Sequence, residues 1–252
     1  MYKNKLKARL KGGEACLGCF ISIGHPAITE IAALGGLDFV IIDTEHGDSD
    51  FQNVINHIRA AEVHGVTPIV RVTSHDRKQI GRYLDNGAYG VQVPMVGNAK
   101  EAKAIADSTR FAPMGERGVS GGRGNVFWGK RSLSEGKEFS NEQVMSVCMV
   151  ETRSGLEDIE NIAKVPNIDV IFIGTSDLSG DMGLVPGCPE MESAISRILA
   201  ACQANGVTPG IVTADPVDSR KRIAQGFKYV TILNTEVLLR NTIEKLVKEV
   251  RG

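Results

Sequence analysis

The sequence predicts an α/β fold, a (β/α)8 barrel (TIM barrel) formed by a single domain over residues 1–252. Three observations favour this fold. The length of 252 residues is typical of one such barrel, although it would also allow two smaller domains. Short apolar runs rich in β-branched residues alternate eight times with longer segments of helical period. Aromatic residues make up only 5% of the chain, so we expect a core of aliphatic side chains, as in a buried parallel sheet.

The eight apolar runs are the expected strands. Both faces of each run are apolar, which indicates strands that are covered on both sides, as in a closed barrel. An open, doubly wound sheet would show the same pattern and is the alternative. In chain order, the expected strands are Cys16–Ile23, Asp38–Asp43, Thr67–Val72, Tyr89–Pro94, Ser146–Val150, Asp169–Gly174, Pro209–Val212 and Lys228–Leu233.

An expected helix follows each strand. Glycine stands at or just beyond several helix ends, where a left-handed conformation is common. The expected helices are Pro26–Gly35, Phe51–His64, Asp76–Gly87, Asn98–Thr109, Gly155–Lys164, Pro189–Asn205, Pro216–Gly226 and Thr235–Val250. Between the fourth helix and the fifth strand, Arg110–Gln143 shows no regular period and is expected to be a long functional loop.

Composition argues against several classes of function. A net charge of -1 gives no reason to expect nucleic acid or an anionic membrane as a partner. No apolar run approaches the roughly 20 residues that span a bilayer, and no signal-peptide core follows the basic segment Met1–Lys11, so we expect a cytoplasmic protein. Cys16 and Cys19 stand three positions apart on one strand, which indicates buried thiols rather than a redox or zinc pair.

Chemistry-bearing residues follow several of the expected strands. Asp43–Gly47 ends the second strand, Arg71 ends the third, Glu151–Arg153 follows the fifth, and Gly174–Asp177 follows the sixth. The C-terminal ends of the strands of a barrel meet at one rim, where active sites lie. We therefore expect these residues to converge there, although they are far apart in the sequence.

Each of these residue types has a chemical interpretation and a structural alternative. Glu151 and Asp177 would bind a hard cation such as Mg²⁺ or Mn²⁺, or else cap helices and form surface ion pairs. Arg71 would neutralise a carboxylate or an enolate oxygen, or else pair with a rim acid. His46 would act as a general base, because histidine titrates near neutrality, or else have a structural role.

Two further patterns bear on the type of chemistry. No expected strand ends in lysine, and Lys228 begins the last strand, so metal-assisted enolisation is favoured over Schiff-base chemistry. The glycine-rich segment Gly118–Asn125 lacks the spacing of a phosphate-binding loop. We interpret it as a mobile flap that carries Arg123 over the site.

Five segments, in chain order, resemble the HpcH/HpaI aldolases, which are class II pyruvate aldolases of the phosphoenolpyruvate/pyruvate barrel superfamily. The likeness extends over nearly the whole chain. The segments are Phe39–Gly47, Val93–Val96, Arg117–Val119, Val150–Arg153 and Phe172–Gly183. The resemblance implies a divalent-metal-dependent carbon–carbon lyase that cleaves or forms 4-hydroxy-2-oxo acids through a pyruvate enolate.

The resemblance also implies roles for individual residues. Glu151 and Asp177 match metal ligands, for Mg²⁺, Mn²⁺ or Co²⁺. His46 matches the catalytic base, and Asp43 and Asp85 match acids that orient it, with Asp85 acting across a subunit interface.

The implied partners are a 2-oxo acid, such as pyruvate or oxaloacetate, and an aldehyde. Arg71 matches the arginine that stabilises the enolate. Backbone N–H groups of Thr175, Ser176 and Asp177, directly after Gly174, would hold the pyruvate carboxylate. Members of the family typically form hexamers in which the last helix is exchanged between neighbours.

Three departures from the family pattern concern the second substrate. Met149 stands where these aldolases usually have Gln, Thr175 stands where they have Pro, and the flap differs from the commoner Ala/Arg-rich version. We therefore expect an acceptor other than an ordinary sugar-acid semialdehyde. One alternative is a citrate synthase-type condensation of oxaloacetate with acetyl-CoA, as in siderophore pathways. The other is a non-catalytic metabolite-binding barrel. The joint presence of His46, Arg71, Glu151 and Asp177 argues against this second alternative.

Overall fold

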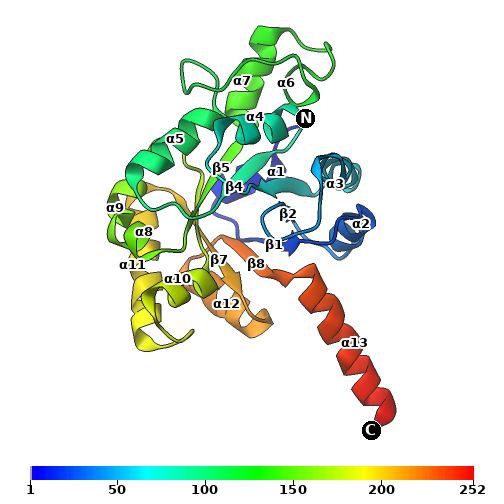
Figure 1. The fold of residues 1–252 in the computed structure, drawn as a ribbon, viewed down its shortest axis with the longest axis vertical. Coiled ribbons are helices and arrows are strands. Elements are labelled where there is room, and N and C mark those ends of the chain that lie inside the picture. The colour runs from blue at the N-terminus through cyan, green and yellow to red at the C-terminus, as the bar shows by residue number, and fades with distance from the viewer. Residues whose placement is uncertain (1) are drawn as a thin grey trace.

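The computed structural model describes residues 2–252, which form a closed barrel of eight parallel strands (Figure 1). The strands are β1 (Cys16–Ile21), β2 (Phe39–Asp43), β3 (Thr67–Arg71), β4 (Gly90–Val93), β5 (Met145–Val150), β6 (Val170–Ile173), β7 (Thr208–Thr213) and β8 (Tyr229–Asn234). Each strand pairs with the next one, and β8 closes the barrel by pairing with β1, with Cys16 opposite Tyr229. The expected (β/α)8 barrel is confirmed, and the open doubly wound sheet is excluded.

Most of the helices surround the barrel. The first and the last helix differ: one closes the N-terminal end of the barrel and the other extends away from it. They are α1 (Lys5–Lys11), α2 (Ala27–Leu34), α3 (Phe51–His64), α4 (Arg77–Asp85), α5 (Ala99–Thr109), α6 (Arg123–Val126), α7 (Leu133–Gln143), α8 (Arg153–Glu157), α9 (Ile159–Ile162), α10 (Thr175–Met182), α11 (Pro189–Asn205), α12 (Pro216–Gln225) and α13 (Thr235–Arg251). The expected helix after β5 is divided into α8 and α9, and α1 and α10 were not expected as helices.

The segment Arg110–Gln143 is not the irregular loop that the sequence predicts, because it contains α6 and α7. The buried residues of α7 are Gly136, Ser140 and Gln143, so the helix shows no apolar period. A capping box at its start, formed by Ser132 and Glu135, was the available signal in the sequence.

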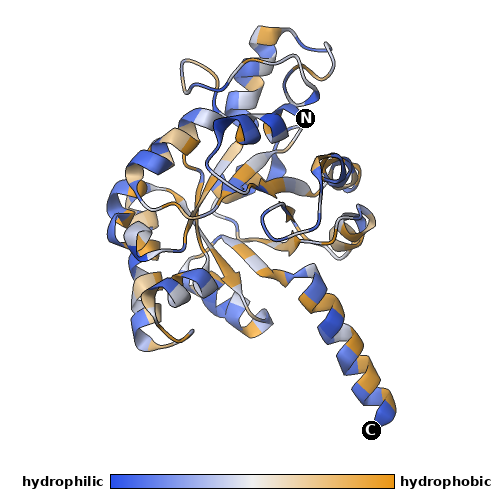
Figure 2. Ribbon diagram, in the orientation of Figure 1, coloured by the Kyte–Doolittle hydropathy of each residue, from blue (hydrophilic) through white to orange (hydrophobic). Residues whose placement is uncertain are grey.

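The interior of the barrel is filled by side chains from its own strands. The rings of Phe39 and Tyr229 stack with centroids 4.1 Å apart, and a Cβ at Gly18 would overlap the Phe39 ring. Leu6 and Leu10 of α1 belong to the same buried cluster, so α1 closes the N-terminal end of the barrel. Figure 2 shows the apolar strands at the centre and alternating hydropathy on the surrounding helices. The open end of the barrel is therefore the C-terminal rim.

The last helix, α13, extends away from the barrel (Figure 1). Its N-cap is Asn234, whose side chain accepts from the N–H of Val237, and Thr235 is its buried residue. Leu239, Ile243 and Leu246 on this helix are each about half exposed or more. Within residues 2–252, no helix is long and apolar enough to cross a membrane.

Candidate active site

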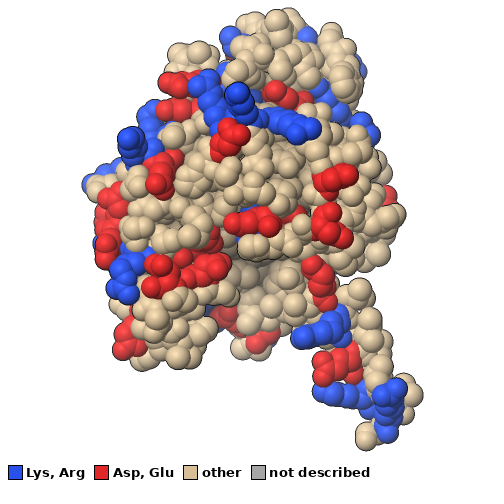
Figure 3. All heavy atoms as spheres, viewed as in Figure 1, with Lys and Arg blue, Asp and Glu red and all other residues tan. Residues whose placement is uncertain are grey.

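A cavity of about 360 Å³ opens at the C-terminal rim of the barrel. Figure 3 shows acidic side chains gathered around a hollow at the centre of the face that it draws. The structure brings most of the residues singled out in the sequence to this cavity. Those that line it are Asp43, His46, Arg71, Gly174, Thr175, Ser176 and Asp177.

A tight turn after β2 places His46 at the cavity. The Oδ1 atom of Asp43 accepts hydrogen bonds from the backbone N–H groups of Glu45 (3.0 Å) and His46 (3.2 Å). Gly47 completes the turn, and a Cβ there would overlap the backbone oxygen of Asp43. Asp43 therefore orients the backbone of His46.

The His46 imidazole itself is largely open to solvent. Its side chain is 67% exposed, and its Nε2 atom lies 3.9 Å from Oε2 of Glu45. Burial raises the pKa of Glu45, while the charges of Arg71 and His46 act in the opposite direction. Glu45 was not singled out in the sequence, although it lies beside His46 in the same rim segment.

Arg71, at the end of β3, is held by two carboxylates. Its Nε and Nη2 atoms donate to Oδ1 (2.9 Å) and Oδ2 (2.5 Å) of Asp43, and its Nη1 atom lies 3.1 Å from Oε2 of Glu45. The guanidinium also stands over the ring of Phe20, 4.8 Å from its centroid. Arg71 thus makes the ion pairs that the structural alternative predicts and also faces the cavity.

Glu151 follows β5 and is almost completely buried, with 3% of its surface exposed. Its Oε1 atom accepts the N–H of Met95 (2.6 Å), and a Cβ at Gly174 would overlap its Oε2 atom. The pKa of Glu151 is raised to about 7, chiefly by desolvation. The charges of Asp177 and Glu45 act in the same direction, and the hydrogen bond from the Met95 N–H acts in the opposite direction. Glu151 therefore lies among other carboxylates, and the charge of Arg71 opposes their effect on its pKa.

The donor set fits a hard divalent cation. Within the part of the chain that the structure describes, no three His, Cys, Asp or Glu side chains are arranged to hold a metal. The protein would supply two carboxylates, from Glu151 and the exposed Asp177, and water and substrate oxygens would complete the shell. A cation at this position would offset the repulsion among the acids. A closed structural zinc site does not fit this set.

Asp85 and Arg123 do not reach the cavity of their own chain. The Oδ1 atom of Asp85 accepts from Arg117 Nη2 (2.7 Å) and Asn125 Nδ2 (3.0 Å). Arg123 pairs with Glu62 and donates to the backbone oxygen of Asn86. These contacts fasten the glycine-rich segment to the ends of α3 and α4. The expected flap with Arg123 over the site is therefore not formed within residues 2–252 of one chain.

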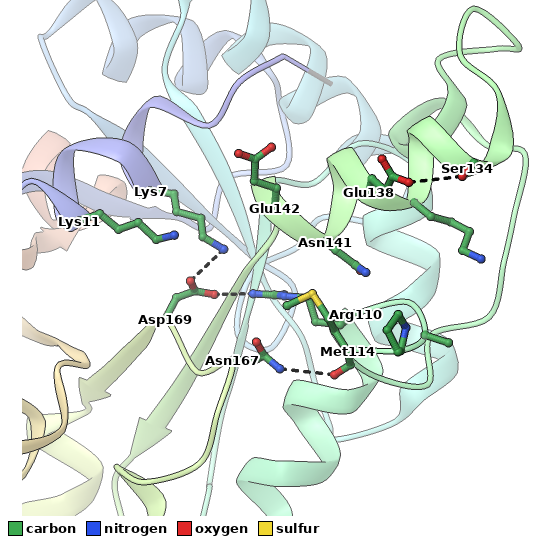
Figure 4. A pocket seen from close by; sticks show the side chains of 13 residues that line it. Lys7, Lys11, Arg110, Met114, Ser134, Glu138, Asn141, Glu142, Asn167 and Asp169 are labelled. Atoms are coloured by element: carbon green, nitrogen blue, oxygen red, sulfur yellow. Dashed lines mark hydrogen bonds and ion pairs between the residues drawn. The ribbon is translucent and has the colours of Figure 1, made fainter.

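A larger cavity, of about 670 Å³, lies at the opposite end of the barrel (Figure 4). There the Oδ1 atom of Asp169 is 3.0 Å from Nζ of Lys7, and its Oδ2 atom accepts from Nη2 of Arg110 (2.8 Å). Burial lowers the pKa of Lys7 to about 8, which the charge of Asp169 partly offsets. This network fastens α1 to the strand ends. The smaller cavity, where Asp43, Asp177, Arg71 and His46 converge, is the candidate active site.

The fold is a TIM barrel, and acids, an arginine and a histidine meet at its C-terminal rim. This combination is typical of a class of barrel enzymes. Comparisons with known proteins show to which family of that class the chain belongs. The sequence profile of the HpcH/HpaI aldolase/citrate lyase family matches residues 16–241. The chain belongs to this family.

Similar proteins are found across the family. The chain is 32% identical over 245 residues to a hydroxypyruvate/pyruvate aldolase of Pseudomonas aeruginosa, covering 96% of this chain and 91% of that one. It is 30% identical over 249 residues to a 5-keto-4-deoxy-D-glucarate aldolase of Klebsiella pneumoniae, covering 98% and 96%.

Solved structures agree. A family member from Burkholderia cenocepacia superposes with a TM-score of 0.93 at 31% identity, covering 99% of this chain and 100% of that one. The citrate synthase SbnG superposes with a TM-score of 0.89 at 30% identity, covering 98% and 97%.

Proposed function

We propose that this protein is a divalent-metal-dependent aldolase that cleaves or forms 4-hydroxy-2-oxo acids through the enolate of pyruvate. The proposal rests on one observation above all. The nearly buried carboxylate of Glu151 lies near two further acids, Asp177 and Glu45, and Asp177 and Arg71 line the cavity at the rim. The relatives named as aldolases support the same chemistry.

The start of α10 suits the carboxylate of a 2-oxo acid. The N–H of Leu178 makes a hydrogen bond of 3.0 Å to the oxygen of Gly174. The N–H groups of Thr175, Ser176 and Asp177 precede it, so they have no carbonyl partner inside the helix. A helix N-terminus of this kind binds anions. These three groups would orient the 2-oxo acid at the wall of the cavity.

Glu151 and Asp177 would hold Mg²⁺, Mn²⁺ or Co²⁺, and the bound cation would stabilise the negative charge of the enolate as a Lewis acid. Arg71, kept in place by Asp43 and Glu45, adds a fixed positive charge at the cavity wall. His46 accepts the proton of the C4 hydroxyl group as the C3–C4 bond breaks and the aldehyde leaves. The electron pair of that bond passes to the enolate, which takes up a proton at C3 to give pyruvate.

Pyruvate release from oxaloacetate tests the proposal without knowledge of the aldehyde. Metal-stripped protein is assayed with and without Mg²⁺, Mn²⁺ or Co²⁺. We expect release that depends on metal and falls at least 100-fold in Glu151→Ala, the scale of effect for lost electrostatic stabilisation. Glu142→Ala, on the exposed side of α7, is the matched control and should retain activity. If the protein releases no pyruvate with any of these metals, the result would favour a metabolite-binding barrel instead.

A second candidate is the condensation of oxaloacetate with acetyl-CoA, favoured by the similarity to SbnG. Release of free thiol from acetyl-CoA in the presence of oxaloacetate would distinguish this reaction from aldol chemistry. An aldolase should release none, while both enzymes should respond to the same metals.

We also propose that the protein is a homo-oligomer, a hexamer, in which α13 packs on a neighbouring subunit. The support is the apolar side of α13, which includes Leu239, Ile243 and Leu246 and lies exposed in the single chain. Such an assembly would also give Asp85 a route to a neighbouring site.

A further inference from the structure

Glu236 lies in the first turn of α13 and lines the cavity at the rim. It is half-buried, and the hydroxyl of Thr235 donates to its Oε2 atom (3.1 Å). Among the ion pairs recorded for residues 2–252, none includes Glu236. A carboxylate therefore stands in the wall of the cavity without a cationic partner from its own chain.

The other charges in the wall do not compensate Glu236. Arg71 is the one Lys or Arg among the described residues that line the cavity, and it is already held by Asp43 and Glu45. Asp177 is assigned to the metal together with Glu151. The charge of Glu236 is thus left over when the remaining groups are paired.

The rest of this part of the wall offers no cationic partner for an anion, because Ser22 and Asn234 are polar but uncharged. The side chains of Met149, Val212, Leu233 and Val237 are apolar. A cavity of about 360 Å³ is roughly 9 Å across, close to the screening length of about 8 Å at physiological salt. A second negative charge inside the cavity would therefore lie within about one screening length of Glu236 and would be repelled by it. A hydroxyl group in the same place would donate a hydrogen bond to it.

We infer that Glu236 is a specificity-determining residue that selects uncharged, hydroxylated aldehydes over aldehydes that carry a carboxylate. This inference rests on the proposed aldolase function and adds the chemical class of the second substrate. The preference for the aldehyde would then be set by Glu236, which is not one of the proposed metal ligands.

Glycolaldehyde and glyoxylate are suitable probes, because each has two carbons and they differ in a hydroxymethyl group against a carboxylate. The measurement is kcat/KM for addition of pyruvate to each. We expect the native protein to prefer glycolaldehyde. Glu236→Gln should shift the ratio about tenfold toward glyoxylate, the effect of one charge roughly 6 Å away at an intermediate dielectric. Glu236→Lys should shift it further in the same direction.

Glu249→Gln is the matched control, because it removes the same charge from the exposed far end of α13 and should leave the ratio unchanged. The ratio is independent of the fraction of active protein, so partial misfolding of a variant does not imitate the effect. An unchanged ratio in both Glu236 variants, or a native preference for glyoxylate, overturns the inference.

Metal-dependent exchange of the methyl protons of pyruvate separates this inference from the proposed function. The exchange requires the enolate but no aldehyde. Native protein that shows no exchange with any metal contradicts the aldolase proposal itself. If the native protein exchanges these protons but the Glu236 variants leave the ratio of kcat/KM for the two aldehydes unchanged, only the role of Glu236 is contradicted.

Discussion

At the scale of single residues, two glycines shape the candidate site together with its charged groups. Gly47 and Gly174 each stand where a Cβ would overlap a neighbouring oxygen, the backbone oxygen of Asp43 in one case and Oε2 of Glu151 in the other. The first allows the turn that presents His46. The second allows α10 to begin directly against Glu151. The position of the two proposed metal ligands therefore depends on the absence of a side chain between them.

Gly174→Ala tests this close approach. The added methyl group must displace the Glu151 carboxylate or the start of α10, because it cannot fit beside Oε2. We expect metal affinity to fall about tenfold or more, a loss of at least ~1.4 kcal/mol. Calorimetric titration of the stripped protein with Mn²⁺ provides the measurement.

Gly180→Ala, in the same helix, is the control, because nothing lies within 4 Å of the Cβ it would add. It should leave metal affinity unchanged and stabilise the helix slightly. Equal affinities in the two variants would show that the contact with Glu151 does not govern metal binding.

At the scale of elements, the contact between α2 and α3 contains a buried histidine. The Nδ1 atom of His57 lies 2.8 Å from the hydroxyl of Thr29, and the side chain is 0% exposed. Desolvation lowers the pKa of His57 to about 4, with a further contribution from His25, while Asp48 acts in the opposite direction. The contact between these helices is therefore made by a neutral imidazole.

This histidine makes stability depend on pH. The folded chain binds the proton more weakly than the unfolded chain, so the free energy of unfolding is unaffected above pH 6.5 and decreases as the pH falls from 6.5 toward 4. The loss has an upper bound of about 3 kcal/mol. Urea titrations between pH 7.5 and 4.5 would measure it.

His57→Gln should lower stability at pH 7.5 but flatten the decrease below pH 6.5. His64→Gln, on an exposed position of the same helix, should keep the decrease. If the His57 variant loses stability in acid as steeply as the native protein, other groups dominate the effect.

At the scale of the whole molecule, two features of the single chain favour an assembly of several copies. The apolar side of α13 faces solvent, and Asp85, expected to act across a subunit interface, pairs with Arg117 and does not line the cavity of its own chain. An assembly of several copies would resolve both, because α13 would then bury its apolar side and Asp85 would lie at an interface. Burial of that surface is the driving force for such an assembly.

The double substitution Leu239→Glu and Ile243→Glu should break the assembly, because two charges would then have to be buried against a neighbouring subunit. Light scattering during gel filtration would measure the mass of native and variant protein. We expect six copies for the native protein and fewer for the variant. Asn241→Glu, a change at an exposed polar position of α13, should leave the mass unchanged. A native mass of one chain would contradict the proposed hexamer.

The sequence by itself determined the barrel and the convergence of the candidate site residues at one rim. All eight strands were predicted because each is a local run of apolar residues, and period and composition depend only on near neighbours. The convergence of Asp43, His46, Arg71 and Gly174–Asp177 then followed, since the C-terminal ends of parallel strands meet at one rim.

Only the tertiary structure decided which of these groups are paired and which are left free. Within one chain, Arg123 pairs with Glu62, and Glu45 shares Arg71 with Asp43. Glu236 joins the cavity wall from a helix near the end of the chain. Each of these outcomes depends on contacts between residues distant in the sequence, and local patterns contain no information about such contacts.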